Sequence, residues 1–214
     1  MPDVFAALDH ADDTTVGRLA GMLEARGHEV CQRRMRRHYL RLVDLPEQAH
    51  VVELGCGTGV LTRELARHPR VAHTLGLDNC ARLIGMARDR DDRAEYRCAD
   101  VHTLPLGDGS ADVVIAHTLF SHLPDPKQVL EETYRVLRPG GRLVIFDGDY
   151  SSVTSGPVAD DPLAQCVAAW RGAYVYDPHI RAQLADLVRG AGFGQLVEHS
   201  YDYAPDDPTY LLSI

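Results

Sequence analysis

Residues 51–59, VVELGCGTG, decide the fold expected for this chain. The first four residues of this stretch predict a strand that is buried on both faces. Gly55, Gly57 and Gly59 tolerate positive φ and let the backbone approach a ligand closely. Apolar spacing over residues 61–67 then predicts a helix, whose free N–H groups face the ligand. A strand, a glycine turn and a helix in this order predict a pocket for a nucleotide-bearing cofactor.

Further strand signals alternate with helix-like stretches along the chain. Strands are expected at residues 51–54, 73–78, 95–100, 112–117 and 142–148. Helices are expected between them at residues 61–68, 81–90 and 127–138, the last ending at Pro139-Gly140-Gly141. This alternation predicts a doubly wound, Rossmann-like α/β fold, a mostly parallel sheet with helices on both faces. Ligands of such sheets bind at the carboxyl ends of the strands, near the point where the strand order reverses.

The two ends of the chain are expected to complete this domain. Residues 1–48 hold helix candidates at 14–27 and 30–43 and are predicted to form an N-terminal helical cap, or lid. Residues 49–214 are predicted to form the cofactor-binding domain. Within it, a substrate-side insertion near 149–178 precedes a helix at 179–193.

The last residues raise a question about the sheet. Residues 194–204 read as a sixth strand, but only a short segment ending in LLSI (211–214) remains for a seventh, antiparallel strand. Either the seventh strand is vestigial, or this sequence stops before the natural end of the protein. We favour the second alternative, which predicts an unpaired edge beside the fifth or sixth strand.

Composition limits the class of protein. The chain has 214 residues, 45% hydrophobic and 25% charged, which predicts one globular domain. A net charge of −9 argues against binding to nucleic acid. The absence of a long apolar run and of signal-peptide features in residues 1–13 predicts a cytoplasmic protein that does not span a membrane. The five cysteines form no CxxC pair, so neither a disulfide framework nor a metal site is expected.

Several motifs downstream of the glycine turn carry a family resemblance. Asp78 and Asp100 end the second and third expected strands, and HLPDP (122–126) is followed by VLRPGGRLVIFD (136–147). In this order the motifs resemble the class I S-adenosylmethionine-dependent methyltransferases, in the branch related to ubiquinone and menaquinone methyltransferases. The resemblance spans about residues 49–148.

The resemblance implies S-adenosylmethionine as the cofactor and a role for each matching residue. The methionine part would lie along the glycine turn and Glu53, the ribose at Asp78, and the adenine at Asp100. Other residues would line the adenine and sulfonium ends. The implied cofactor-binding residues are Glu53, Gly55, Cys56, Gly57, Gly59, Asp78, Asn79, Asp100, Val101, Ala116 and His117. From the residues alone, Glu53 also fits a structural carboxylate, Asp78 a helix cap and Asp100 a turn.

The glycine turn also suggests two other functions. The fingerprint of a nicotinamide dehydrogenase requires GxGxxG, but Val60 occupies the position of the last glycine. A protein that binds S-adenosylmethionine without transferring its methyl group is the alternative from another class. We favour methyl transfer to a small organic acceptor, such as a secondary metabolite or a quinone-like or polyketide-like compound, on oxygen, carbon or nitrogen.

The chemistry requires positioning and, for a hydroxyl or an acidic carbon, a base. His117 and His122 are the candidate catalytic bases because they follow the fourth strand, although both also fit packing roles. Asp149 and Tyr150, after the fifth strand, are candidate wall residues of the acceptor pocket.

Two further groups of side chains have open roles. Residues 33–37 carry four arginines, Arg33, Arg34, Arg36 and Arg37, which predict a solvated or ion-paired helix face. One of these arginines, or Tyr39, is an alternative ligand for the cofactor carboxylate. Trp170, Tyr174 and Tyr176 are candidates either for an aromatic acceptor pocket or for plain packing.

Overall fold

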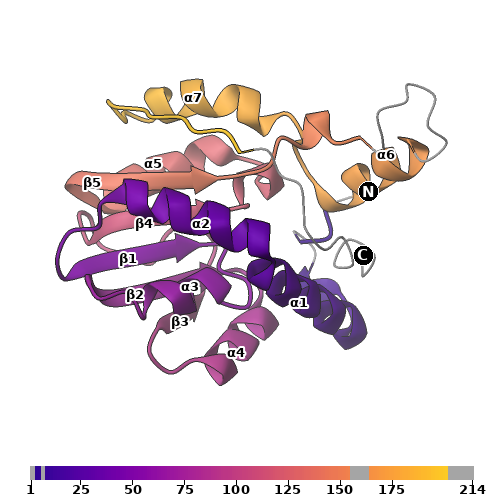
Figure 1. Ribbon diagram of the computed structural model, residues 1–214, viewed down its shortest axis with the longest axis horizontal. Helices are drawn as coiled ribbons and strands as arrows, with labels where there is room; N and C mark the ends of the chain where they lie inside the picture. Colours follow the sequence, from indigo (N-terminus) through magenta and orange to yellow (C-terminus); the bar gives the residue numbers. More distant parts are fainter. Residues whose placement is uncertain (1–2, 6–7, 155–163, 202–214) are drawn as a thin grey trace.

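A five-stranded parallel sheet forms the centre of the computed structural model, with strand order β3-β2-β1-β4-β5 (Figure 1). The structure describes residues 3–5, 8–154 and 164–201. The strands are β1 (Ala49–Leu54), β2 (Val71–Asp78), β3 (Glu95–Cys98), β4 (Ala111–His117) and β5 (Leu137–Phe146). The chain builds β1, β2 and β3 outward in one direction, then returns to the other side of β1 for β4 and β5. The strand order therefore reverses between β1 and β4, and the predicted doubly wound fold is confirmed.

Helices cover both faces of the sheet (Figure 1). They are α1 (Asp13–His28), α2 (Val30–Val43), α3 (Val60–Leu65), α4 (Ala81–Arg90), α5 (Pro126–Val136), α6 (Ala164–Tyr174) and α7 (Ile180–Gly190). Three short 3₁₀ helices join them, η1 (Leu8–His10), η2 (Phe120–His122) and η3 (Tyr150–Ser152). None of the described helices is long and apolar enough to cross a membrane.

Each face of β1 packs into a different core. Val51 lies in a buried cluster with side chains of α2 and α3, such as Tyr39 and Leu61. Val52, its neighbour, lies in a second cluster with side chains of α5 and α7, such as Leu130. Successive side chains of a strand point to opposite faces, so a strand with apolar residues at consecutive positions needs helices on both sides. The two helices expected at 14–27 and 30–43 are present as α1 and α2. Because α2 shares a core with β1, the predicted boundary at residue 48 does not separate two packed bodies.

The HLPDP motif serves to start a helix. The carboxylate of Asp125 caps α5 by accepting a hydrogen bond of 3.2 Å from the backbone N–H of Gln128. Pro126 occupies the first helical turn, where a missing N–H costs nothing. The short loop between β4 and α5 is thereby held in place, and it carries His122.

The start of β5 differs from the expectation. The helix predicted to run to residue 138 ends at Val136, and β5 includes Pro139, Gly140 and Gly141. The pairing with β4 shifts register here, and Gly140 has φ of 80°. The extra residues therefore form an irregular first part of the strand, which glycine permits because it tolerates positive φ.

The expected strand at 194–204 is wrong within the described residues. Residues 194–201 form no strand, and most of their side chains are exposed, with Val197 68% accessible. An alternating pattern alone does not form a sheet, because β-propensity depends strongly on the packing around the segment. In the described part of the chain β5 lies at an edge of the sheet, whereas the segment LLSI lies outside the described residues.

Gly59 provides a test of the turn. Its φ is 81°, and a Cβ there would lie 2.7 Å from the Tyr96 ring. We expect Gly59→Ala to lower the free energy of unfolding by about 1–3 kcal/mol, measured by urea denaturation. Gly85→Ala, inside α4 with nothing within 4 Å of its Cβ, is the control and should raise stability by about 0.5–1 kcal/mol. Equal stability of Gly59→Ala and wild type would contradict the strain expected from the positive φ and from the contact of the added Cβ with Tyr96.

Candidate cofactor and acceptor site

A cavity of about 390 Å³ opens at the carboxyl ends of the strands, where the strand order reverses. Its walls come from the loops after β1 to β4, from α1 to α4 and from the segment before α1. The lining residues are Phe5, Leu8, Leu23, Arg26, Gly27, Gln32, Arg36, Glu53, Gly55, Cys56, Gly57, Thr58, Val60, Leu61, Leu83, Asp78, Asn79, Asp100, Val101, His102, His117, Thr118, Leu119, His122, Leu123 and Pro124.

The glycine turn is fixed to the neighbouring strand by two hydrogen bonds. The N–H of Cys56 donates to the Leu77 carbonyl at 2.9 Å, and the N–H of Gly57 donates to Asp78 Oδ2 at 2.8 Å. The φ values of Gly55 and Gly57 are 67° and 54°. A Cβ on Gly55 would lie 2.8 Å from the Leu119 side chain. The turn therefore needs glycine both for its conformation and for the space beside the cavity.

Asp78 is a buried carboxylate with two bonds to backbone. Its second oxygen, Oδ1, accepts from the N–H of Cys80 at 2.9 Å. Burial raises the pKa of this carboxyl, although the N–H groups of Cys80 and Gly57 act in the opposite direction. A carboxylate has about four acceptor sites, so after these two bonds Asp78 keeps capacity for two hydroxyl donors.

Glu53 supplies a second buried carboxylate, at the end of β1. The side chain is 3% exposed, and the Thr62 hydroxyl donates to its Oε2. Burial raises the pKa of Glu53 to about 8, and the Arg36 guanidinium partly opposes that rise. A buried carboxyl with so little charge compensation favours a cationic ligand.

The far side of the cavity carries an ionised acid. Asp100 Oδ1 accepts hydrogen bonds from the backbone N–H of His102 at 2.9 Å and faces its Nδ1 at 2.7 Å. The His102 N–H holds the pKa of Asp100 below its ordinary value. Val101 lies beside it with 8% exposure.

His117 ends β4 in an aromatic environment. Its ring stacks on Phe146 with centroids 4.6 Å apart, and its Nδ1 lies 2.8 Å from the Tyr39 hydroxyl. Burial lowers the pKa of His117 well below 6.5. The imidazole is therefore neutral at physiological pH, and the hydroxyl of Tyr39 is occupied by this contact.

His122 lies on η2 and faces a different partner. Its Nδ1 is 2.5 Å from Asp3 Oδ2, and the Phe5 ring meets the imidazole edge to face at 5.0 Å. The cavity thus contains both histidines that the sequence singled out, each held by a hydrogen bond at Nδ1.

Two of the expected cofactor residues do not line the cavity. Gly59 caps the start of α3, and its α-carbon faces the Tyr96 ring, although its neighbours Thr58 and Val60 line the cavity. Ala116 is fully buried, and its side chain lies in the core against α5 and α7. The other expected cofactor residues, Glu53, Gly55, Cys56, Gly57, Asp78, Asn79, Asp100, Val101 and His117, all line the cavity.

The residues after β5 that were candidates for the acceptor wall also lie outside the lining of the cavity. The lining does not include Asp149, Tyr150, Trp170, Tyr174 or Tyr176. Trp170 instead stacks on Tyr174, which meets Phe5 edge to face at 6.5 Å. Phe5, from residues that the sequence did not single out, provides the aromatic wall.

The four arginines of α2 separate by helical position. Arg33, Arg34 and Arg37 are exposed, as expected for a solvated face. Arg36 is 4% exposed and donates to Glu64 Oε2 at 2.7 Å and to the Gly27 carbonyl at 3.0 Å. Helical periodicity places Arg36 on the inner face with Tyr39, which the local cluster of arginines concealed.

Several lining residues lacked a sequence signal. Arg26 and Gln32 belong to no motif, and Thr58 lies in the 51–59 motif without an assigned role, yet all three line the cavity. Gln32 Oε1 and Thr58 Oγ1 are buried without a hydrogen-bond partner among the described residues. Unpaired buried polar atoms cost free energy, so a polar ligand in this cavity would remove that cost. No group of His, Cys, Asp and Glu side chains in the described part of the chain is arranged to hold a metal ion.

The fold and the cavity define a class of protein, one that binds a nucleoside-containing cofactor at the switch point of a parallel sheet. Residues 52–145 match the family model described as a methyltransferase domain. The chain is 34% identical over 145 residues to a demethylmenaquinone methyltransferase of Lactiplantibacillus plantarum, covering 64% of this chain and 58% of that protein. It is 36% identical over 106 residues to a trans-aconitate 2-methyltransferase of Variovorax paradoxus, covering 50% of this chain and 41% of that protein.

A solved structure has the same fold. The S-adenosylmethionine-dependent methyltransferase from Aquifex aeolicus superposes with a TM-score of 0.63 at 19% identity, over 88% of this chain and 93% of that chain. That structure shows the fold, and the family model and the sequence relatives show that the chain belongs to the class I S-adenosylmethionine-dependent methyltransferases. It spans about half the length of the curated relatives that it matches.

The charge of Glu53 predicts a pH dependence of stability. The pKa is about 8 in the folded protein against an ordinary 4.5. Because the folded pKa is raised, stability is fully present below about pH 4.5 and is lost as the pH rises through about 8. Glu53→Gln should match wild type at pH 5 and exceed its free energy of unfolding by roughly 2–5 kcal/mol above pH 8, measured by urea denaturation. Glu131→Gln, exposed on α5, is the control. Parallel curves for wild type and Glu53→Gln would contradict the raised pKa.

Proposed function

We propose that this protein transfers a methyl group from S-adenosylmethionine to a small organic acceptor by in-line displacement at the sulfonium. The observation that carries the proposal is the order of side chains along the carboxyl edge of the sheet. Asp100 follows β3, Asp78 ends β2, and the glycine turn follows β1. His117 ends β4, the next strand. Neighbouring strands lie about 4.8 Å apart, so these groups form a row that suits a base, a ribose and an amino-acid tail in line.

Each part of the cofactor has a candidate partner in this row. We assign the adenine to Asp100 and Val101, and the ribose hydroxyls to the free acceptor sites of Asp78, with Asn79 beside it. The methionine part would lie along Gly55, Cys56 and Gly57. Its ammonium group would meet Glu53 and the unpaired oxygen of Gln32, and Arg36 would face its carboxylate. These roles follow from the lining of the cavity and from the charge of each group.

This assignment directs the reacting end of the cofactor toward β4. When bound, the cofactor supplies a methyl group on a positively charged sulfur. The residues after β4 would position the acceptor there and exclude water, which supplies much of the acceleration of such a displacement. Of the two candidate bases, we assign proton removal to His122 and a wall role to His117, whose Nδ1 contacts Tyr39 and whose ring stacks on Phe146.

The small acceptor is supported by the cavity and by the names of the relatives. Phe5 and Leu8 line the cavity, whose volume of about 390 Å³ is of the size of a small-molecule site. The relatives named above carry trans-aconitate and demethylmenaquinone in their names. We further propose a cytoplasmic protein that does not act on nucleic acid, and its net charge of −9 supports the second point.

Calorimetry with S-adenosylhomocysteine tests the cofactor site. The intact protein should bind it, and Asp78→Ala should weaken binding by about 30-fold or more, because ribose acceptors and the Gly57 anchor are lost together. Asp89→Ala, an exposed carboxylate on α4, should leave the affinity unchanged. Undiminished binding by Asp78→Ala would count heavily against the assignment.

A labelled-methyl transfer screen tests the reaction itself. The acceptors are phenols, polyketide-like acids and quinone precursors, incubated with the full chain and labelled S-adenosylmethionine. We expect label in at least one acceptor, with one S-adenosylhomocysteine formed for each methyl transferred. Tight cofactor binding with no label transferred to any acceptor would instead favour the alternative, a binding protein that does not methylate.

A further inference from the structure

The residues before α1 place a carboxylate against His122. The Asp3 side chain is fully buried, and its Oδ2 lies 2.5 Å from His122 Nδ1. Its other oxygen, Oδ1, accepts from the Phe5 backbone N–H at 2.8 Å. Both oxygens of Asp3 therefore have partners, and neither faces solvent.

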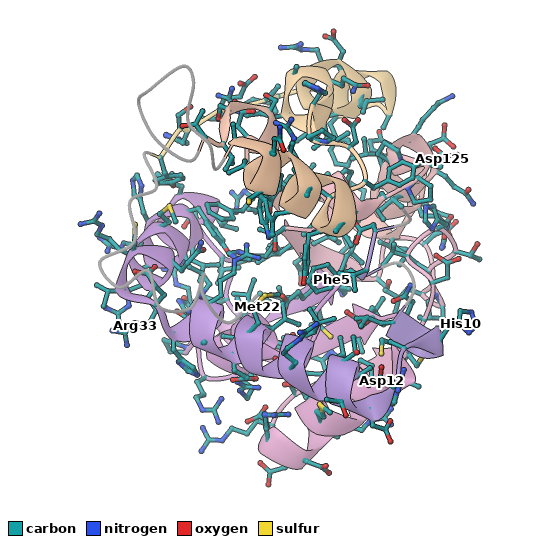
Figure 2. All side chains as sticks on the ribbon, turned by 90° about the vertical axis from the view of Figure 1, so that its right-hand side faces the viewer. Phe5, His10, Asp12, Met22, Arg33 and Asp125 are labelled. Carbon is teal, nitrogen blue, oxygen red and sulfur yellow. The ribbon has the colours of Figure 1, made fainter. Side chains whose placement is uncertain are left out.

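Contacts with three helices, α1, α4 and α6, hold this segment beside the cavity. The N–H of Val4 donates to the Ala173 carbonyl at 3.1 Å, at the end of α6. Leu8 packs with α1 and α4, and Figure 2 shows Phe5 between α6 and α1. Phe5 also touches the edge of His122. The carboxylate is thus delivered by a segment that bridges the two sides of the cavity.

The contact with Asp3 determines which nitrogen of His122 is free. A carboxylate accepts hydrogen bonds, so Nδ1 carries the proton and Nε2 keeps its lone pair. His122 lines the cavity, its side chain is 14% exposed, and no described residue bonds to Nε2. The partner of His117 is different, because its Nδ1 contacts the hydroxyl of Tyr39 and not a carboxylate.

No neighbouring ionisable group replaces Asp3 as the hydrogen-bond partner of the His122 imidazole among the described residues. Asp147, just after β5, is partly buried and accepts from the backbone N–H groups of Ser121 and Gly148 at 3.1 and 2.9 Å. Burial raises the pKa of Asp147 and also that of the Tyr150 hydroxyl nearby. The carboxylate in contact with the imidazole is therefore that of Asp3.

We propose that Asp3 and His122 form a proton-accepting dyad, and that the methyl acceptor is a compound whose hydroxyl must lose its proton to react. This rests on the proposed function. The acceptor hydroxyl gives its proton to Nε2 of His122, and its oxygen lone pair forms the new bond to the methyl carbon. The electron pair of the broken C–S bond stays on sulfur. Asp3 stabilises the imidazolium, which then releases its proton to solvent. A neutral amine needs no base before it attacks, so the dyad favours a hydroxyl acceptor.

In this proposal His122 touches the acceptor and Asp3 is a positioning residue. The first test is nitrogen NMR of histidine-labelled protein saturated with S-adenosylhomocysteine, with His122 assigned through His122→Gln. We expect His122 in the Nδ1–H tautomer in wild type and a loss of that tautomer in Asp3→Ala. An Nε2–H tautomer in wild type, or an unchanged spectrum in Asp3→Ala, would overturn the dyad.

The second test uses the hydroxyl acceptors that the transfer screen returns. Asp3→Asn and His122→Gln should each lower kcat by roughly 100-fold or more, with the affinity for S-adenosylhomocysteine changed less than twofold. The loss should shrink for an acceptor whose hydroxyl is already ionised at the assay pH, which a merely structural role of Asp3 would not produce. Asp13→Asn, an exposed carboxylate on α1, is the control.

The outcomes separate this proposal from the proposed function. The same screen is extended to amines and thiols, and label in those acceptors alone would contradict the dyad and leave methyl transfer standing. Equal losses of kcat for ionised and protonated acceptors also contradict it. Failure of the chain to bind S-adenosylhomocysteine would instead remove the proposed function.

Discussion

The hydrogen bond from the Gly57 N–H to Asp78 Oδ2 is the interaction on which the site depends. It joins the turn after β1 to the end of β2, and it requires a turn with positive φ that only glycine adopts without strain. Beneath the turn, Gly76 leaves room for the Cys56 and Thr62 side chains, since a Cβ there would lie 2.9 Å from each. The backbone thus forms the floor of the cavity, and a carboxylate stands beside it in a fixed orientation.

The parallel sheet converts this local motif into a row of chemical groups. Every strand ends at the same edge, so the residues that follow the strands meet there although they are far apart in sequence. The reversal of strand order between β1 and β4 leaves a crevice at that edge. Asp78 lies on one side of the crevice, and His122 lies on the other. The two sides carry different chemistry, with the carboxylates of Asp78 and Asp100 on one and the imidazoles of His117 and His122 on the other.

Burial gives these groups their chemical character. Glu53 is buried at the end of β1 with a raised pKa, whereas Asp100 is exposed and has a lowered one. A cationic ligand is favoured near the first, and a neutral donor near the second. Arg36, one of two arginines that line the cavity in the described part of the chain, is itself held by Glu64, so its charge is oriented before any ligand arrives.

The sequence alone determined the strands, the glycine turn and the acids at the ends of β2 and β3. Apolar runs, glycine conformation and strand ends are local properties, because each depends on residues that are adjacent in the sequence. The sequence did not show that Gly59 and Ala116 lie outside the lining of the cavity, because it holds no information on which face each residue presents. The sequence pattern alone also predicts a strand at 194–204, and residues 194–201 form none.

Only the tertiary structure decided how distant segments complete the site. It selected Arg36 from four arginines, because the packing of α2 on β1 buries one side of that helix. It brought Asp3 to His122 across 119 residues of chain, and it placed Phe5 in the wall where Trp170 and its neighbours were candidates. Such contacts depend on how helices pack over the edge of the sheet. No spacing in the sequence indicates that packing. The motif of residues 51–59 differs, because the conformation of its turn depends on nine consecutive residues.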